Sequence, residues 1–254
     1  MDQEAVARIM AENDVLAVPV LDEQRRMKGI ITHDDIQDVV QEEATEDIQK
    51  IGGTETLDTP YLQTGFGQMI RKRAGWLSVL FLGETLTASA MGYFEHEIGK
   101  ALVLSLFIPL IISSGGNSGS QASTLVIRAM ALGEVRLRDW WRVFLREIGA
   151  GLALGALLGL LGMLRIVLWH AFFEEDGRPM YGEHFLLIGT TVALSVIGVA
   201  TWGTLVGALL PFGLKRLGLD PASASAPLVA TLSDVTGIVI FFSVAAVVLG
   251  GVSP

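Results

Sequence analysis

The feature that most limits what this chain can fold into is a series of long apolar runs after residue 75. Each run is long enough to cross a hydrocarbon core of about 30 Å, which needs about 20 residues in a helix. A helix also pairs its own backbone polar groups, as a lipid environment requires. We therefore predict an all-α membrane protein with five transmembrane helices. They cover residues 75–94, 101–130, 146–170, 185–214 and 224–251.

The segment before these runs is strongly acidic. Residues 1–60 contain 15 acidic and 5 basic residues, whereas residues 61–254 contain 12 acidic and 13 basic residues. A segment with a net charge of −10 repels nucleic acid and attracts cations. The sequence contains no cysteine, which excludes disulfides and thiolate metal sites. We therefore expect the lipid bilayer and divalent cations as partners, and no nucleic acid.

Basic residues around the predicted spans indicate the orientation. Ten of them flank the spans on one side: Arg71, Lys72, Arg73, Arg128, Arg136, Arg138, Arg142, Arg146, Lys215 and Arg216. The opposite side has only Lys100, Arg165 and Arg178. Because basic residues concentrate on the cytoplasmic side, we expect a multi-pass cell (inner) membrane protein. Its N-terminus would be cytoplasmic and its C-terminus outside.

Residues 1–33 have the pattern of a small α/β unit. Residues 1–13 are typical of a short helix, and residues 16–21 and 27–32 of two strands joined by a polar turn. Residues 34–51 then predict an amphipathic helix that ends at Gly52 and Gly53, within a helical segment that we assign to residues 34–56. A linker over residues 57–74, which contains Pro60, follows. The remaining domain, residues 75–254, would be the membrane part.

The predicted helix after the α/β unit is unusually acidic. Seven carboxylates fall within residues 34–47. They could form a solvated helix face, or they could sense a divalent cation, because hard cations such as Mg²⁺ prefer carboxylate oxygens. Both interpretations remain open from the residues alone.

Two of the predicted spans carry polar groups that are costly in lipid. In the second span, residues 113–121 contain no large apolar side chain, which favours either close packing of helices or a water-lined path. The fifth span contains Asp234, which has no basic residue in its span. This carboxylate could be neutral and hydrogen-bonded, or it could face a cation. Glu84 in the first span could equally pack in the bundle or serve the function.

Several stretches together resemble the MgtE family of Mg²⁺ channels and transporters. VPVLD at residues 18–22 and GIITHDD at 29–35 are similar to the second half of a cystathionine-β-synthase (CBS) domain. The family likeness also lies in EATEDI at 43–48, GGNSGSQ at 115–121, RLRDW at 136–140 and PLVATLSDVTG at 227–237. The resemblance implies a homodimer with a central cation pore. In such a protein, cytoplasmic domains close the pore at high Mg²⁺, and the acidic helix acts as a plug.

The resemblance also implies roles for single residues. Asp234 would be the pore ligand, with Mg²⁺, or alternatively Mn²⁺, Co²⁺ or Ca²⁺, in the same site. The other expected metal ligands are Asp35, Asp38, Glu43, Glu46, Asp47, Glu95 and Asp220. The expected pore-lining residues are Ser113, Gly116, Asn117, Ser120, Gln121, Ala226, Pro227, Ala230 and Thr231, with Glu84 as a further candidate.

Three functions remain compatible with this pattern. The first is a dimeric channel that conducts hydrated Mg²⁺, gated by cytoplasmic Mg²⁺. The second is a secondary transporter in which Glu84 and Asp234 couple cation movement to protons. The third is a non-conducting scaffold that senses Mg²⁺. The sequence contains no phosphate-binding loop, GxSxG or HExxH motif, so we do not expect an enzyme.

Overall fold

A computed structural model describes residues 3–94, 102–175, 178–179 and 181–249. Its first part is a small α/β unit made of helix α1 (Gln3–Glu12) and an antiparallel pair of strands, β1 (Ala17–Leu21) and β2 (Met27–Thr32). Met10 and Ile36 are buried there against Val18 and Ile31. The predicted order of helix, hairpin and helix is confirmed.

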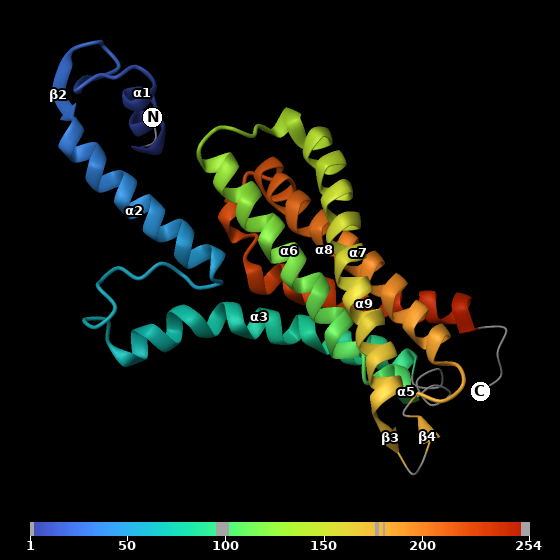
Figure 1. The fold of residues 1–254 in the computed structure, drawn as a ribbon. Helices are drawn as coiled ribbons and strands as arrows, with labels where there is room; N and C mark the ends of the chain where they lie inside the picture. Colours follow the sequence, from blue (N-terminus) through green and yellow to red (C-terminus); the bar gives the residue numbers. More distant parts are fainter. Residues whose placement is uncertain (1–2, 95–101, 176–177, 180, 250–254) are drawn as a thin grey trace.

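Helix α2 (His33–Ile51) follows directly from β2. Asp35 accepts hydrogen bonds from the backbone N–H and the hydroxyl of Thr32, at 2.9 and 2.7 Å, and so fixes the start of the helix. These two bonds lower the pKa of Asp35. The helix ends at Ile51, as predicted, because Gly52 and Gly53 turn the chain. Figure 1 shows α2 crossing from the α/β unit to the bundle.

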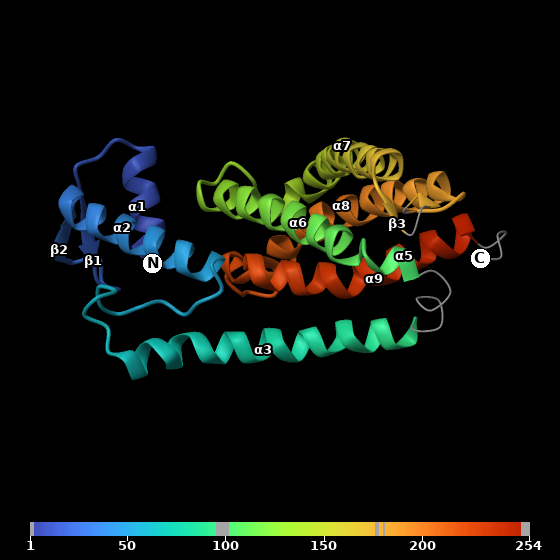
Figure 2. The same ribbon diagram turned by 60° about the horizontal axis from the view of Figure 1, so that its bottom comes forward.

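The second part of the chain is a bundle of long helices. Figures 1 and 2 show α6 to α9 packed side by side, with α3 running along α9. We call the end of the bundle that faces the α/β unit the proximal end, and the opposite end the distal end. The elements are α3 (Phe66–Tyr93), α5 (Leu102–Ser105), α6 (Ile108–Ala131), η1 (Leu137–Asp139), α7 (Trp140–Phe172), β3 (Glu174–Glu175), β4 (Arg178–Pro179), α8 (Phe185–Arg216), η2 (Pro221–Ser223) and α9 (Ala226–Leu249).

Four of these helical segments are long and apolar enough to cross a membrane. They are Val103–Ala131, Leu137–Phe172, Phe185–Arg216 and Ala226–Leu249. The membrane part of the prediction is confirmed to this extent, and the fifth span stays a prediction. Helix α3 is long, but it carries the basic residues 71–73 in its second turn and Glu84 further along. These charges reduce its apolar character. The predicted second span is also interrupted: α5 ends at Ser105, and α6 begins at Ile108 with Pro109 in its first turn.

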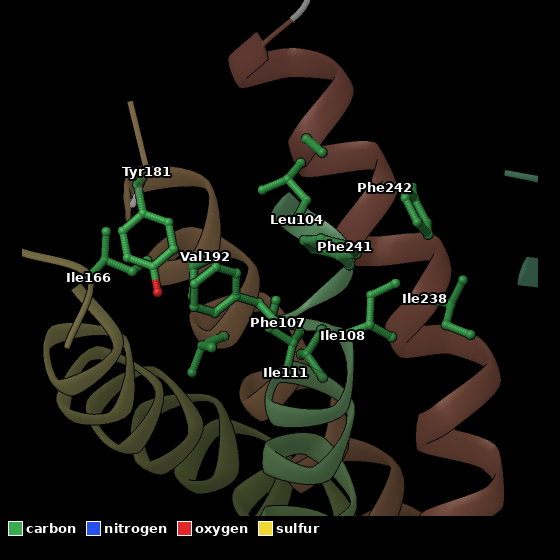
Figure 3. Close-up of a cluster of buried hydrophobic side chains, with 13 residues drawn as sticks. Leu104, Phe107, Ile108, Ile111, Ile166, Tyr181, Val192, Ile238, Phe241 and Phe242 are labelled. Carbon is green, nitrogen blue, oxygen red and sulfur yellow. The ribbon is translucent and has the colours of Figure 1, made fainter. Parts of the chain in front are cut away.

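An apolar cluster holds the distal end together. Phe107, directly before α6, and Ile111 of α6 pack with Val192 of α8 and with Ile238 and Phe241 of α9 (Figure 3). Each of these side chains is almost fully buried. Because the cluster draws on three helices, it fixes their spacing at this end of the bundle.

Glycines set the spacing along the rest of the bundle. A Cβ atom at Gly119 of α6 would lie 2.7 Å from the carbonyl oxygen of Gly203 in α8, and one at Gly207 would overlap the carbonyl of Gly119. On the other side of α8, a Cβ atom at Gly155 of α7 would lie 2.7 Å from the Cα atom of Ile197. The helices therefore touch backbone to backbone, as small residues four apart allow in membranes.

We expect Gly207→Ala to lower the free energy of unfolding by about 1–3 kcal/mol, because its methyl group forces α6 and α8 apart. Thermal unfolding of both proteins in one detergent measures this. Gly213→Ala is the matched control. Gly213 lies on the same helix, and a Cβ atom there would have no neighbouring atom within 4 Å. Equal unfolding midpoints for the two variants would contradict the close contact.

Candidate functional site

A cavity of about 530 Å³ lies between α3, α5, α6 and α9. Helix α6 forms most of its wall, from Ile108 to Ser120, a distance of about 18 Å at 1.5 Å per residue. Met91 of α3 and Ser105 of α5 line it near the distal end. The remaining lining residues are Pro109, Ile112, Ser113, Gly116, Asn117, Ala230 and Asp234.

Helix α6 separates its small residues onto two faces. Gly115 and Gly119 turn toward α8, whereas Ser113, Gly116 and Asn117 line the cavity. The helix runs without a break, and the Asn117 amide donates to the hydroxyl of Ser113 at 3.3 Å. Close packing of helices is therefore found on one face of α6, and a water-lined path along the other face stays a prediction.

Asp234 is the charged residue that reaches this cavity. It is partly buried in the middle of α9. A Cβ atom on Gly116 would lie 4.0 Å from its carboxylate oxygen Oδ1, so the bare glycine leaves room in front of the carboxylate. No basic side chain pairs with Asp234 among the residues that the structure describes.

Glu84 lies close to this site. Its carboxylate oxygen Oε1 accepts a hydrogen bond from the hydroxyl of Thr231 at 3.0 Å, and Thr231 is buried. Thr231 stands one turn before Asp234 on α9, and the carboxylates of Glu84 and Asp234 repel each other. The structure thus brings together two acids that are 150 residues apart in the sequence.

A second group of charges lies at the proximal end. The ammonium group of Lys50, at the end of α2, pairs with Glu46 on the same helix and with Asp220 at 2.5 Å. Asp220 also accepts the backbone N–H of Ala222 and so begins η2. Partial burial alone would lower the pKa of Lys50, but the hydrogen bonds and charges of Asp220 and Glu46 outweigh it and raise that pKa. Lys50 therefore binds α2 to the segment before α9.

A second cavity, of about 580 Å³, lies beside this ion pair. Glu43 and Asp47 of α2 line it together with Asp220, and Arg8 and Lys215 add positive charge to its wall. Acids from the soluble part and from the bundle therefore meet at the proximal end. Within the described residues, no three acidic or histidine side chains are grouped closely enough to hold a metal ion by themselves.

The segment 220–227 joins the two regions. The hydroxyls of Ser120 and Ser123 on α6 donate to the backbone carbonyls of Ala226 and Ala224, at 3.2 and 2.8 Å. The indole N–H of Trp76 on α3 donates to the hydroxyl of Ser225 at 3.2 Å. Together with Lys50, these bonds tie α2, α3 and α6 to the start of the helix that carries Asp234.

The other predicted site residues are spread over the chain. Asp35 caps α2, Asp38 and Gln121 are exposed, and neither Ala226 nor Pro227 lines the first cavity. Pro227 instead lies beside the turn that ends α2, because a Cβ atom on Gly53 would come within 3.1 Å of its ring. Glu95 lies outside the described residues.

Our sequence analysis missed Lys50 and Trp76, which make the contacts between distant segments. No local pattern marks either residue, because their partners lie 170 and 149 residues away. The glycine contacts did leave a signal in the sequence. Glycines at intervals of four residues, at positions 151, 155 and 159 and again at 203 and 207, predict faces where helices pack closely.

The fold and the cavities define a class: a multi-helix membrane protein with a cavity between its helices that one carboxylate, several polar groups and apolar side chains line, and with an α/β unit at one end. A sequence model of the MgtE family, described as a divalent cation transporter, matches residues 108–244, and a CBS domain model matches residues 1–42. The chain belongs to the MgtE family of divalent cation transporters.

Three characterised proteins named magnesium transporter MgtE are similar over almost the whole chain. The protein of Thermus thermophilus is 44% identical over 251 residues, which are 99% of this chain and 53% of the relative. The protein of Enterococcus faecalis is 34% identical over 96% of this chain and 50% of the relative. That of Bacillus subtilis is 33% identical over 96% and 51%. The chain thus spans about half the length of the curated relatives it matches.

We expect Lys50→Gln to loosen the contact of α2 with the bundle. Spin labels on cysteines introduced at the exposed positions Thr45 and Leu132 measure this distance specifically, because the sequence has no other cysteine. In a chelating buffer, the wild type should give one narrow distance distribution and Lys50→Gln a broader one. Lys28→Gln is the control, since Lys28 pairs with Asp22 inside the α/β unit.

The same measurement has an expected pH dependence. A group whose folded pKa is raised stabilises the fold below its unfolded pKa, and it loses that contribution as the pH rises through the folded value. Because the pKa of Lys50 lies above its usual value of 10.5, the narrow distribution of the wild type should persist up to about pH 10.

The Lys50→Gln comparison has its own contradicting outcome. A distance distribution in Lys50→Gln that equals that of the wild type would show that Lys50 does not hold α2 in place.

Proposed function

We propose that this chain forms part of a Mg²⁺ transport path through the cell membrane, with Asp234 as the principal cation ligand. The proposed path uses five spans, α3 included, and two copies of the chain around a central pore. The proposed domains are residues 1–33 as a partial CBS domain, 34–56 as the plug, 57–74 as the linker and 75–254 as the pore domain.

The observation that carries the proposal is the setting of Asp234. Its carboxylate faces a cavity lined by the hydroxyls of Ser113 and Ser120 and the amide of Asn117. Mg²⁺ gives up its water reluctantly and is usually held through retained waters by one or two carboxylates. A path with few charges and several hydrogen-bonding groups fits such a hydrated ion, and weak binding also permits release. The three relatives named as magnesium transporters support the same ion.

The arrangement of the helices supports the proposed orientation and gating. The links between α6 and α7 and between α8 and α9 lie at the proximal end, near the α/β unit (Figure 1). The ten basic residues counted in the sequence flank the helices at this end, which agrees with a cytoplasmic N-terminus. Helix α2 reaches Asp220 there through Lys50, so a movement of α2 could be passed to α9.

The proton-coupled transporter is the second candidate, and one observation favours it. Glu84 and Asp234 repel each other without a basic partner in the described part of the chain, and such a pair can share a proton. A channel should pass Mg²⁺ down either gradient at a rate that an imposed pH gradient leaves unchanged. A coupled transporter should accumulate Mg²⁺ when only the proton gradient drives it.

We expect the purified chain in liposomes to admit Mg²⁺ and Asp234→Asn to reduce the uptake to that of protein-free liposomes. The substitution removes the charge and keeps the shape, so the cation loses its main ligand. A fluorescent Mg²⁺ indicator inside the liposomes follows the uptake. Asp139→Asn is the matched control, because Asp139 lies in η1 at the proximal end, away from the first cavity.

Two other results would change the conclusion. Equal uptake by wild type and Asp234→Asn would remove Asp234 as the essential ligand. Background uptake by the correctly inserted wild type would favour the non-conducting scaffold over a transport path.

A further inference from the structure

We propose that Glu84 on α3 is a second cation-attracting residue of the Asp234 path and sets its affinity for divalent ions. This inference rests on the proposed function and deepens it. It adds to the path a side chain from a helix that stands outside the tightly packed group of α6, α7 and α8.

Glu84 belongs to the face of α3 that packs on α9. Leu80, Glu84, Thr87 and Met91 follow one another at three- and four-residue spacing, and Gly83 lies three residues after Leu80, so they share one face of the helix. Leu80 is buried, a Cβ atom on Gly83 would lie 2.8 Å from Thr231, and Met91 lines the first cavity. The carboxylate therefore stands on a strip of α3 that leads along α9 to the cavity.

Thr231 holds this carboxylate in place. Its buried hydroxyl donates to Oε1 of Glu84 at 3.0 Å, while Gly83 lets the two helices approach closely enough for the bond to form. One carboxylate oxygen is used by Thr231, and the lone pairs of the second oxygen remain available to water or a cation. The side chain is thus oriented rather than free to turn into solvent.

The two negative charges on either side of Thr231 favour the binding of a cation. Glu84 and Asp234 flank Thr231, repel each other and have no basic partner within the described ranges. Two partly buried carboxylates at such a place either share a proton or attract positive charge. A hydrated divalent ion neutralises both at once without direct contact with either, because Mg²⁺ keeps several of its waters.

Thr87 supplies an independent observation on the same strip. It stands almost one turn beyond Glu84, and its hydroxyl is buried without a hydrogen-bond partner in the described part of the protein. A buried hydroxyl without a partner needs a water or another ligand to satisfy it. Thr87 therefore adds a polar group to the strip of α3 between Glu84 and Met91.

The test compares the Mg²⁺ dependence of uptake into liposomes for wild type, Glu84→Gln, Glu84→Asp and Asp234→Asn. Glutamine keeps an oxygen for the Thr231 hydroxyl and removes only the charge. We expect Glu84→Gln to raise the half-saturating Mg²⁺ concentration roughly fivefold with little change in the maximal rate, the order expected for one charge near a divalent ion in a partly hydrated site. Glu84→Asp, which keeps the charge, should stay closer to wild type.

The matched control is Glu147→Gln. Glu147 is also a partly buried acid within a bundle helix, but it lies on α7 away from the first cavity. Its half-saturating concentration should equal that of wild type. A second readout is the preference for Mg²⁺ over Na⁺, which should fall in Glu84→Gln because the divalent ion loses twice the attraction.

The outcomes separate this inference from the proposed function. Loss of uptake in Asp234→Asn with wild-type affinity and ion preference in Glu84→Gln would overturn the role of Glu84 and leave the function standing. A lower maximal rate in both Glu84 variants at unchanged half-saturation would make Glu84 a structural residue and overturn the inference as well. Equal uptake by wild type and Asp234→Asn would remove Asp234 as the essential ligand, and background uptake by the correctly inserted wild type would remove the proposed function itself.

Discussion

The contact on which the rest of this structure depends is the backbone approach of α6 to α8. Lipid gives helices no hydrophobic reason to associate, so association relies on close packing and hydrogen bonds. Gly119 meets the carbonyl of Gly203, and Gly151 and Gly155 of α7 meet α8 from its other side. Because its glycine face is used in this way, α6 turns its polar face toward α9. The cavity beside Asp234 is therefore a consequence of the packing: the same sequence run supplies the contact and the cavity wall.

The segment before and at the start of α9 is bonded to three other helices. The segment 220–227 accepts bonds from Lys50 of α2, Trp76 of α3 and the two serines of α6, and most of it is shielded from solvent. The hydrogen bonds at Ala224 and Ala226 use backbone carbonyls before the first complete turn of α9, where side chains can reach them. Asp234 follows two turns later on the same helix. Lys50 therefore connects α2 to the segment that begins the helix of Asp234, and Val229 of that helix lies against Gly119 of α6.

Composition and periodicity were enough to predict the division into an acidic α/β unit and a helical membrane part, because both follow from local patterns. The order of helix, hairpin and helix in residues 3–51 is confirmed, and so are four helices able to span a membrane. The end of α2 at Ile51 was predicted from Gly52 and Gly53, but the short break before Pro109 was not, since apolar runs do not mark where a helix stops. The site was harder still. Asp234 attracts notice as an isolated charge in an apolar span, but the bonds of Lys50 to Asp220 and of Thr231 to Glu84 join residues more than 140 positions apart. Only the packing of α2 against η2 and of α3 against α9 brings those groups together.

The two acidic regions differ in what neutralises them, and this difference separates their roles. At the proximal end, Glu46 and Asp220 have Lys50 between them, so a group that cannot leave partly balances their charge. Such a balance holds one arrangement of α2. Beside the first cavity, Glu84 and Asp234 have no basic partner in the described part of the chain, and the nearby groups are hydroxyls and an amide. A lysine side chain at this place would neutralise part of the charge of the pair, but it would also fill the space in front of Gly116. In the proposed path, this unbalanced charge attracts a mobile cation, and the cavity gives that cation room to enter and to leave.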